Sequence, residues 1–141
     1  MPNSLTQQAF EDWRSTGDLL KDSLSRYVPY DRSKKYTPQE MEFYDSLSFR
    51  YTKALEAAFY FFRSIELELN GKSSEFARDQ LLKMEKVQII LSVDEWMEAR
   101  KLRNKMAHAY KPEELEKIYA EVIIFAHMVL DALTKAKKFA C

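Results

Sequence analysis

The sequence predicts an all-α fold, an up-and-down bundle of about five helices with one long second helix. The 141 residues include only 2 glycines and 4 prolines, which leaves little material for tight turns. No Asn-Gly or Asp-Gly pair lies between segments of alternating hydrophobicity, and the good helix formers Leu, Ala, Glu, Lys and Met are abundant. Apolar residues recur at intervals of three and four, as the buried side of a helix requires.

Size and charge predict one domain without a general affinity for polyanions. A chain of 141 residues that is 46% hydrophobic can bury one continuous core, so we expect a single domain over residues 1–141. Residues 1–36 form its N-terminal helix and linker, and residues 38–137 form its core. Because 22 basic residues balance 22 acidic ones, nucleic acid binding requires a local basic patch.

Cysteine content and hydropathy predict a cytoplasmic protein that does not enter a membrane. The only cysteine is Cys141, so no internal disulfide can form and nothing indicates an oxidising compartment. The N-terminal segment lacks the pattern of a signal peptide, and the longest apolar run, residues 122–130, is too short to span a bilayer. No HExxH or CxxC motif is present, so we assign no metal and no cofactor.

The first helix is expected over residues 5–27. Residues 27–36 after it are expected to form a polar linker, and Gly17 puts the continuity of this helix in question. Its apolar positions are Phe10, Trp13, Leu20, Leu24 and Tyr27.

The second helix has the clearest boundaries. Residues 37–40 (Thr-Pro-Gln-Glu) form a capping box with proline at the first helical position, and Asn70-Gly71 supplies a left-handed end. Three aromatic residues, 59–61, lie outside its apolar stripe, so either a second subunit or the N-terminal helix must cover them. The stripe consists of Met41, Tyr44, Ser48, Tyr51, Leu55, Ala58, Phe62, Ile65 and Leu69.

Three shorter segments complete the predicted bundle. The third helix begins with Ser73 or Ser74 as its cap and ends near residue 89. Its apolar positions are Phe76, Leu81, Met84 and Val87. A capping box at residues 92–95 opens the fourth helix, which is expected to end near Tyr110 because Lys111 precedes proline. The last helix runs from Pro112 to the basic residues 135–138.

The segment RNKMAHAY, residues 103–110, combines an arginine, an asparagine and one of two histidines. Helical spacing turns Leu102 and Met106 to the core and aligns Asn104 with His108 on the outer side. Arg103 and His108 are separated by roughly 140° around the helix axis, so their side chains on a single helix cannot readily contact the same substrate atom. Two copies facing each other across a dimer axis could place both in one cleft, and we expect the second and fourth helices to form this homodimer.

These residue types suit metal-free cleavage of RNA, whose 2′-hydroxyl supplies the nucleophile. His108 can transfer protons near neutral pH, Arg103 can stabilise transition-state charge, and Asn104 can orient either group. The nearby basic residues Arg100, Lys101 and Lys105 suit RNA phosphates. On spacing alone, the alternatives are that this segment is an ordinary solvated helix end and that Tyr110 is a packing residue. We interpret His127 as a core or interface histidine and Trp96 as a core residue.

The segment RNKMAHAY fits the R-N-x-x-x-H-x-Y form of the signature of HEPN domains. Residues 73–110 and 45–59 resemble HEPN toxins that pair with minimal nucleotidyltransferase antitoxins, and the resemblance covers most of residues 38–130. It implies a homodimeric, metal-independent endoribonuclease toxin acting on tRNA or mRNA, with Arg103, Asn104 and His108 at the catalytic positions. It also implies that the antitoxin transfers AMP to Tyr110. Relatives described as substrate-binding subunits of nucleotidyltransferases give the alternative, a non-catalytic nucleotide-binding module.

Overall fold

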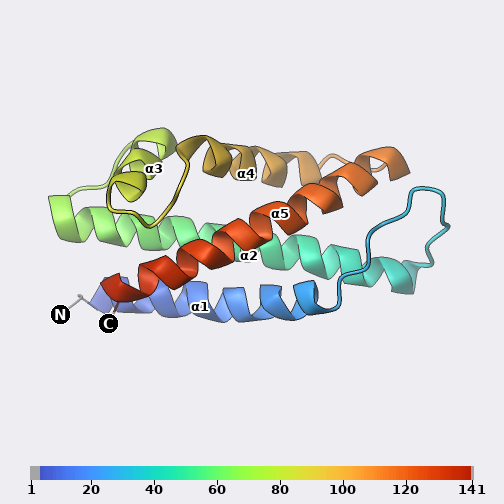
Figure 1. Cartoon of the computed structure of the whole chain (residues 1–141), viewed down its shortest axis with the longest axis horizontal. Helices are drawn as coiled ribbons and strands as arrows, with labels where there is room; N and C mark the ends of the chain where they lie inside the picture. The colour runs from blue at the N-terminus through green and yellow to red at the C-terminus, as the bar shows by residue number, and fades with distance from the viewer. Residues whose placement is uncertain (1–3, 141) are drawn as a thin grey trace.

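A computed structural model describes residues 4–140 and confirms the all-α fold (Figure 1). Over this part of the chain no strand is present, and Cys141 lies outside the described residues. A short 3₁₀ helix, η1 (Lys137–Phe139), follows the last of the five α-helices. These are α1 (Ser4–Ser25), α2 (Pro38–Asn70), α3 (Ala77–Lys86), α4 (Val93–Met106) and α5 (Pro112–Ala136).

The long helix α2 lies at the centre of the arrangement. In Figure 1, α1 runs along one side of α2, α3 and α4 lie on the other side, and α5 crosses the bundle. The most extensive packing is between α1 and α2, and α5 contacts α1, α2 and α4. Within residues 4–140, no helix has the length and apolar content needed to cross a lipid bilayer.

Both predicted ends of α2 are confirmed. The Thr37 hydroxyl accepts a hydrogen bond from the Glu40 backbone N–H at 3.1 Å, and the Glu40 carboxylate accepts one from the Thr37 N–H at 3.0 Å. Gly71 adopts the left-handed conformation, with φ of 76°. The apolar stripe is buried or partly buried along its length except at Leu69, which lies in the last turn and is exposed.

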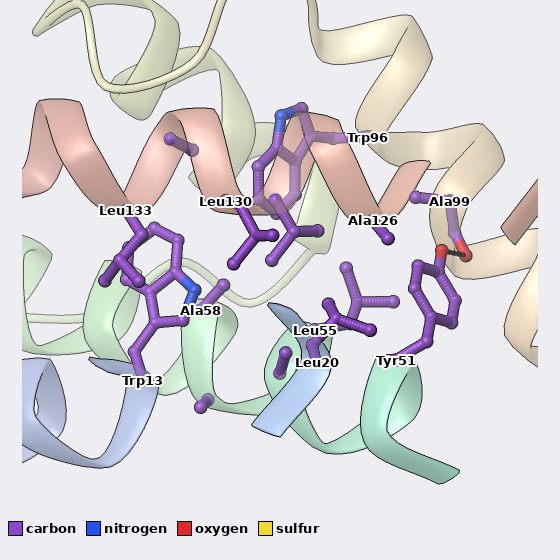
Figure 2. Close-up of a cluster of buried hydrophobic side chains, with 14 of the residues drawn as sticks. Trp13, Leu20, Tyr51, Leu55, Ala58, Trp96, Ala99, Ala126, Leu130 and Leu133 are labelled. Atoms are coloured by element: carbon purple, nitrogen blue, oxygen red, sulfur yellow. Dashed lines mark hydrogen bonds between the residues drawn. The ribbon is translucent and has the colours of Figure 1, made fainter. Parts of the chain in front are cut away.

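Helix α1 covers part of the aromatic surface of α2. The ring of Trp13 lies 5.5 Å from that of Phe61 and 5.7 Å from that of Phe62, and all three side chains are fully buried. Figure 2 shows Trp13 and Leu20 of α1 directed at α2 and α5. The N-terminal helix therefore accounts for Phe61 without a second subunit, whereas Tyr60 stays 68% exposed.

Gly17 does not interrupt α1, which is continuous through this position. A Cβ atom placed there would lie 2.9 Å from Cδ2 of Leu133 and 3.3 Å from Cδ2 of Leu130, both on α5. The glycine thus permits α1 and α5 to approach closely, which compensates for its low helix propensity.

The prediction that Ser73 or Ser74 caps α3 is wrong. The helix begins at Ala77 with no side-chain cap, because the Ser74 hydroxyl donates to the buried carboxylate of Glu66 on α2. Gln80 and Lys83 also donate to this carboxylate, at 2.7 and 3.0 Å. Phe76 is exposed rather than part of the core, while Leu81 and Met84 are buried as predicted.

The linker after α1 is packed, not simply polar. Tyr30 is buried and stacks on Tyr36 with ring centroids 4.6 Å apart. The Tyr44 hydroxyl of α2 donates to the Val28 carbonyl oxygen at 2.6 Å, and burial raises the pKa of Tyr44 above its ordinary value. Tyrosine rings therefore hold residues 28–36 against α2. The prediction of a polar linker, which was based on the charged residues, did not include these contacts.

The fourth helix starts as predicted but ends earlier. The Ser92 hydroxyl accepts a hydrogen bond from the Glu95 N–H at 3.3 Å. The helix ends at Met106, and the His108 N–H donates to the Lys105 carbonyl in a tighter turn, at 3.1 Å. His108 and Tyr110 therefore lie in the connection to α5, since the chain needs several residues to reverse direction before Pro112.

Two predictions about side chains near α4 and α5 have opposite outcomes. Trp96 is 1% exposed and contacts the ring of Phe62, so its assignment to the core is confirmed. His127 was interpreted as a core or interface histidine; it is exposed on α5, so the core interpretation is wrong. The helical period turns Ala126 and Val129 inward and leaves His127 outside.

Candidate functional site

Helix α4 is fixed to α2 by a buried hydrogen bond and apolar contacts. The Tyr51 hydroxyl donates to the Ala99 carbonyl oxygen at 2.9 Å, as the dashed line in Figure 2 marks. Burial raises the pKa of Tyr51 above its ordinary value, so the hydroxyl stays protonated. Ala99 and Leu102 of α4 are buried, whereas Arg100, Arg103 and Asn104 are exposed.

Arg103 is directed at α2 by an ion pair. Its Nη2 atom lies 2.8 Å from Oε1 of Glu56, and the two side chains are 48% and 33% exposed. The other carboxylate oxygen of Glu56 lies 3.9 Å from Nζ of Lys53. Glu56 therefore holds the guanidinium of Arg103 in place over α2.

Arg103 opens into a groove between α2, α3 and α4, which we call the α2–α4 groove. Its volume is about 460 Å³. Within it, the Arg100 guanidinium lies over the ring of Phe59, with 5.7 Å between the guanidinium carbon and the ring centroid. The groove is lined by Leu55, Glu56, Phe59, Tyr60, Arg63, Ala77, Gln80, Arg100 and Arg103.

Asn104 and His108 share a second depression, the α4–α5 hollow, also of about 460 Å³. His108 is exposed, and the hollow mixes two lysines with two glutamates. Its lining residues are Asn104, Lys105, His108, Glu114, Lys117, Ile118 and Glu121. An imidazole and an amide thus face the same open space, where a substrate phosphate could reach both.

One subunit does not bring Arg103 and His108 together. Arg103 lines the α2–α4 groove, whereas His108 lines the α4–α5 hollow. The angle expected from helical geometry does not apply, because His108 lies beyond the end of α4 at Met106. A shared catalytic centre requires residues from a second copy or a rearrangement of the α4–α5 connection.

Tyr110 occupies a separate position. It lies at a depression formed by α2, the α4–α5 connection and α5, beside Ser48 and Leu115. The side chain is 80% exposed, so the interpretation of Tyr110 as a packing residue is wrong. Its hydroxyl is accessible to another protein.

The basic residues assigned to RNA phosphates are divided between different surroundings. Lys101 forms an ion pair with Glu98 at 3.1 Å, Arg100 faces the α2–α4 groove, and Lys105 lines the α4–α5 hollow. The sequence did not single out Glu56 or Arg63 of α2, and it marked Tyr60 only as an aromatic residue outside the apolar stripe. Their spacing of four and three places them on one side of a helix, but only the tertiary packing brings that side to α4.

Comparison with known proteins does not place the chain in a family. No protein-family model, curated protein or solved structure matches it. Within residues 4–140, no group of three or more His, Cys, Asp or Glu side chains is arranged to hold a metal ion. The functional argument therefore depends on the site itself.

Proposed function

We propose that this protein is a HEPN-type, metal-independent endoribonuclease toxin that acts in the cytoplasm as a homodimer. The observation that carries the proposal is that His108 and Asn104 share one open hollow while Arg103 is held by Glu56 at the adjoining groove. A proton-transfer group, a polar orienting group and a fixed cation thus lie on one exposed end of α4. This combination of groups is suited to phosphoryl transfer, which an ordinary solvated helix end would not need.

The reaction uses a hydroxyl of the RNA as nucleophile. Neutral His108 accepts the 2′-hydroxyl proton, the 2′ oxygen bonds to the adjacent phosphorus, and the bond from phosphorus to the 5′ oxygen breaks. The imidazolium returns a proton to the leaving 5′ oxygen, which gives a 2′,3′-cyclic phosphate and a free 5′-hydroxyl. Arg103 stabilises the additional negative charge on the phosphate oxygens in the transition state.

The homodimer is part of this proposal because the two central residues open into different depressions. A two-fold axis beside α4 would let Arg103 of one subunit and His108 of the other line one cleft.

The proposal includes regulation by a nucleotidyltransferase antitoxin that modifies Tyr110, which the exposure of this side chain supports. Its phenol oxygen would attack the α-phosphorus of ATP, pyrophosphate would leave, and the phenol proton would pass to solvent. The 80% exposed side chain is accessible to such a partner. The transferred AMP would add negative charge two residues from His108 and would repel the phosphates of the RNA.

A second candidate function is a non-catalytic nucleotide-binding subunit of a nucleotidyltransferase. The observation that favours it is that Arg103 is already paired with Glu56 and opens away from His108 in its own subunit. In that case the same surface would bind a nucleotide or RNA for the partner without cleaving it.

The experiment compares the two histidines of the chain. Wild-type protein incubated with total RNA in EDTA should release fragments ending in 2′,3′-cyclic phosphate, and expression should arrest growth. His108→Ala and Arg103→Ala should abolish both effects, whereas His127→Ala, on the exposed side of α5, should retain them. Cleavage by a folded His108→Ala protein would overturn the catalytic assignment. Binding without cleavage by the wild type would favour the second candidate.

A further inference from the structure

More basic than acidic side chains line the α2–α4 groove, so the groove has a net positive charge. Arg63 of α2 and Arg100 and Arg103 of α4 line the groove together with a single carboxylate, that of Glu56. Since Glu56 pairs with Arg103 at 2.8 Å, two guanidinium groups remain for an anion. Guanidinium groups bind phosphate through paired N–H donors and keep their charge at all physiological pH values.

Aromatic rings line the same groove. Tyr60 is 68% exposed, so its ring is accessible from solvent. Phe59 is half-buried beneath the Arg100 guanidinium, 5.7 Å away, and edge-on to Trp96 of the core. Phe59 therefore fixes one wall of the groove, and Tyr60 offers a free ring face.

The groove has the dimensions of a small-ligand site. Its volume of about 460 Å³ falls within the range of roughly 300–1,000 Å³ that is usual for such sites. A planar base stacked on Tyr60 would place its phosphate next to the guanidinium groups, because Arg63 is three residues further along α2 and Arg100 lines the same groove from α4. The α4–α5 hollow has no comparable aromatic ring among its lining residues.

We infer that the α2–α4 groove binds a nucleoside phosphate, with the base stacked on Tyr60 and the phosphate held by Arg63 and Arg100. The inference rests on the proposed function in one respect: the bound nucleotide is taken to be part of the RNA strand that His108 cleaves. A free nucleotide presents the same chemistry, and the experiment separates the two sources. Tyr60 and Arg63 are binding residues in this assignment and take no part in proton transfer.

The experiment measures binding of a fluorescently labelled oligoribonucleotide to the full-length protein by anisotropy. Arg63→Glu and Tyr60→Ala should each weaken binding by about tenfold, whereas Tyr60→Phe should bind as the wild type does. Arg14→Glu is the matched control, because Arg14 is exposed on α1, across α2 from α4, and its replacement changes the net charge equally. Thermal unfolding of each variant checks that the fold is retained.

Competition identifies the source of the nucleotide. Displacement of the labelled RNA by unlabelled RNA at far lower concentration than by AMP supports a strand-binding groove. Displacement by AMP at similar or lower concentration supports a free nucleotide in the same groove, and inorganic phosphate should compete least because it has no base to stack.

Failure of this inference is distinguishable from failure of the proposed function. RNA binding that is unchanged in Arg63→Glu and Tyr60→Ala overturns the inference, and so does a wild-type protein that binds neither RNA nor AMP. Binding that is lost in these variants while no protein cleaves RNA upholds the groove and overturns the ribonuclease proposal.

Discussion

The guanidinium of Arg103 on α4 lies 2.8 Å from the carboxylate of Glu56 on α2, although the two residues are far apart in the sequence. The pair orients Arg103 and reduces the positive charge of the α2–α4 groove. Because both side chains are partly exposed, its contribution to stability is expected to be small, within about 1 kcal/mol. The main effect of this ion pair is therefore on the charge of the α2–α4 groove.

Glu56→Gln should therefore leave stability nearly unchanged and strengthen RNA binding. The substitution keeps an acceptor for Arg103 but removes the one carboxylate among the described residues that line the groove, so the attraction for phosphates increases and its salt dependence becomes steeper. Anisotropy titrations at several salt concentrations measure both quantities. Weaker binding by the variant would show that the carboxylate serves RNA binding in another way.

Tyr110→Phe should separate toxicity from control. The substitution keeps the ring and removes the phenol oxygen that would accept AMP, so the protein should fold, dimerise and arrest growth. It should not be inhibited by an antitoxin that transfers AMP. The measurement is intact mass after incubation with the cognate nucleotidyltransferase, ATP and magnesium.

The matched control for this modification is Tyr60→Phe. Tyr60 is also a largely exposed tyrosine, so a variant lacking its hydroxyl should still gain AMP. Equal modification of the wild type and Tyr110→Phe would place the acceptor elsewhere. Inhibition without modification of any protein would favour a steric mechanism.

Glu66→Gln should destabilise the protein in a pH-dependent way. Burial of the carboxylate acts to raise its pKa, but hydrogen bonds from Ser74, Gln80 and Lys83 outweigh burial and hold the pKa below its ordinary value. The ionised form is thus stabilised by folding, and this stability is present at neutral pH and lost as pH falls through the lowered pKa.

At pH 7 the variant should lose about 2 kcal/mol, as expected for hydrogen bonds to a charged group. The difference from the wild type should shrink as the medium becomes more acidic than the ordinary carboxyl pKa of 4.5. Urea unfolding at several pH values measures it. A difference that is the same at pH 7 and pH 3 would mean that the charge of Glu66 does not contribute.

The sequence predicted those features that depend on neighbouring residues. The caps of α2 at Thr37 and Gly71 and the start of α4 at Ser92 are local, because each involves hydrogen bonds within four residues. The cap of α3 failed since Ser74 donates to Glu66, in the preceding helix. No local pattern reveals that competing acceptor.

The features of the candidate site also separate into those that local sequence predicts and those that depend on tertiary packing. Exposure of Asn104 and burial of Leu102 follow from the helical period, and both were predicted. The pairing of Arg103 with Glu56 and the grouping of Arg63 with Arg100 depend on how α2 packs on α4, which the sequence pattern does not specify. The early end of α4, which places His108 in the connection, depends on the path to α5.

The most direct test of the shared cleft mixes two inactive proteins. Arg103→Ala and His108→Ala should each fail to cleave RNA alone, but a refolded equimolar mixture should recover about a quarter of wild-type activity, since half of the dimers are mixed and each contains one intact pair. If Arg103 and His108 act within one subunit, no mixed dimer contains an intact pair. An inactive mixture that contains mixed dimers would therefore contradict the two-subunit site, and recovered cleavage is the result that the account predicts.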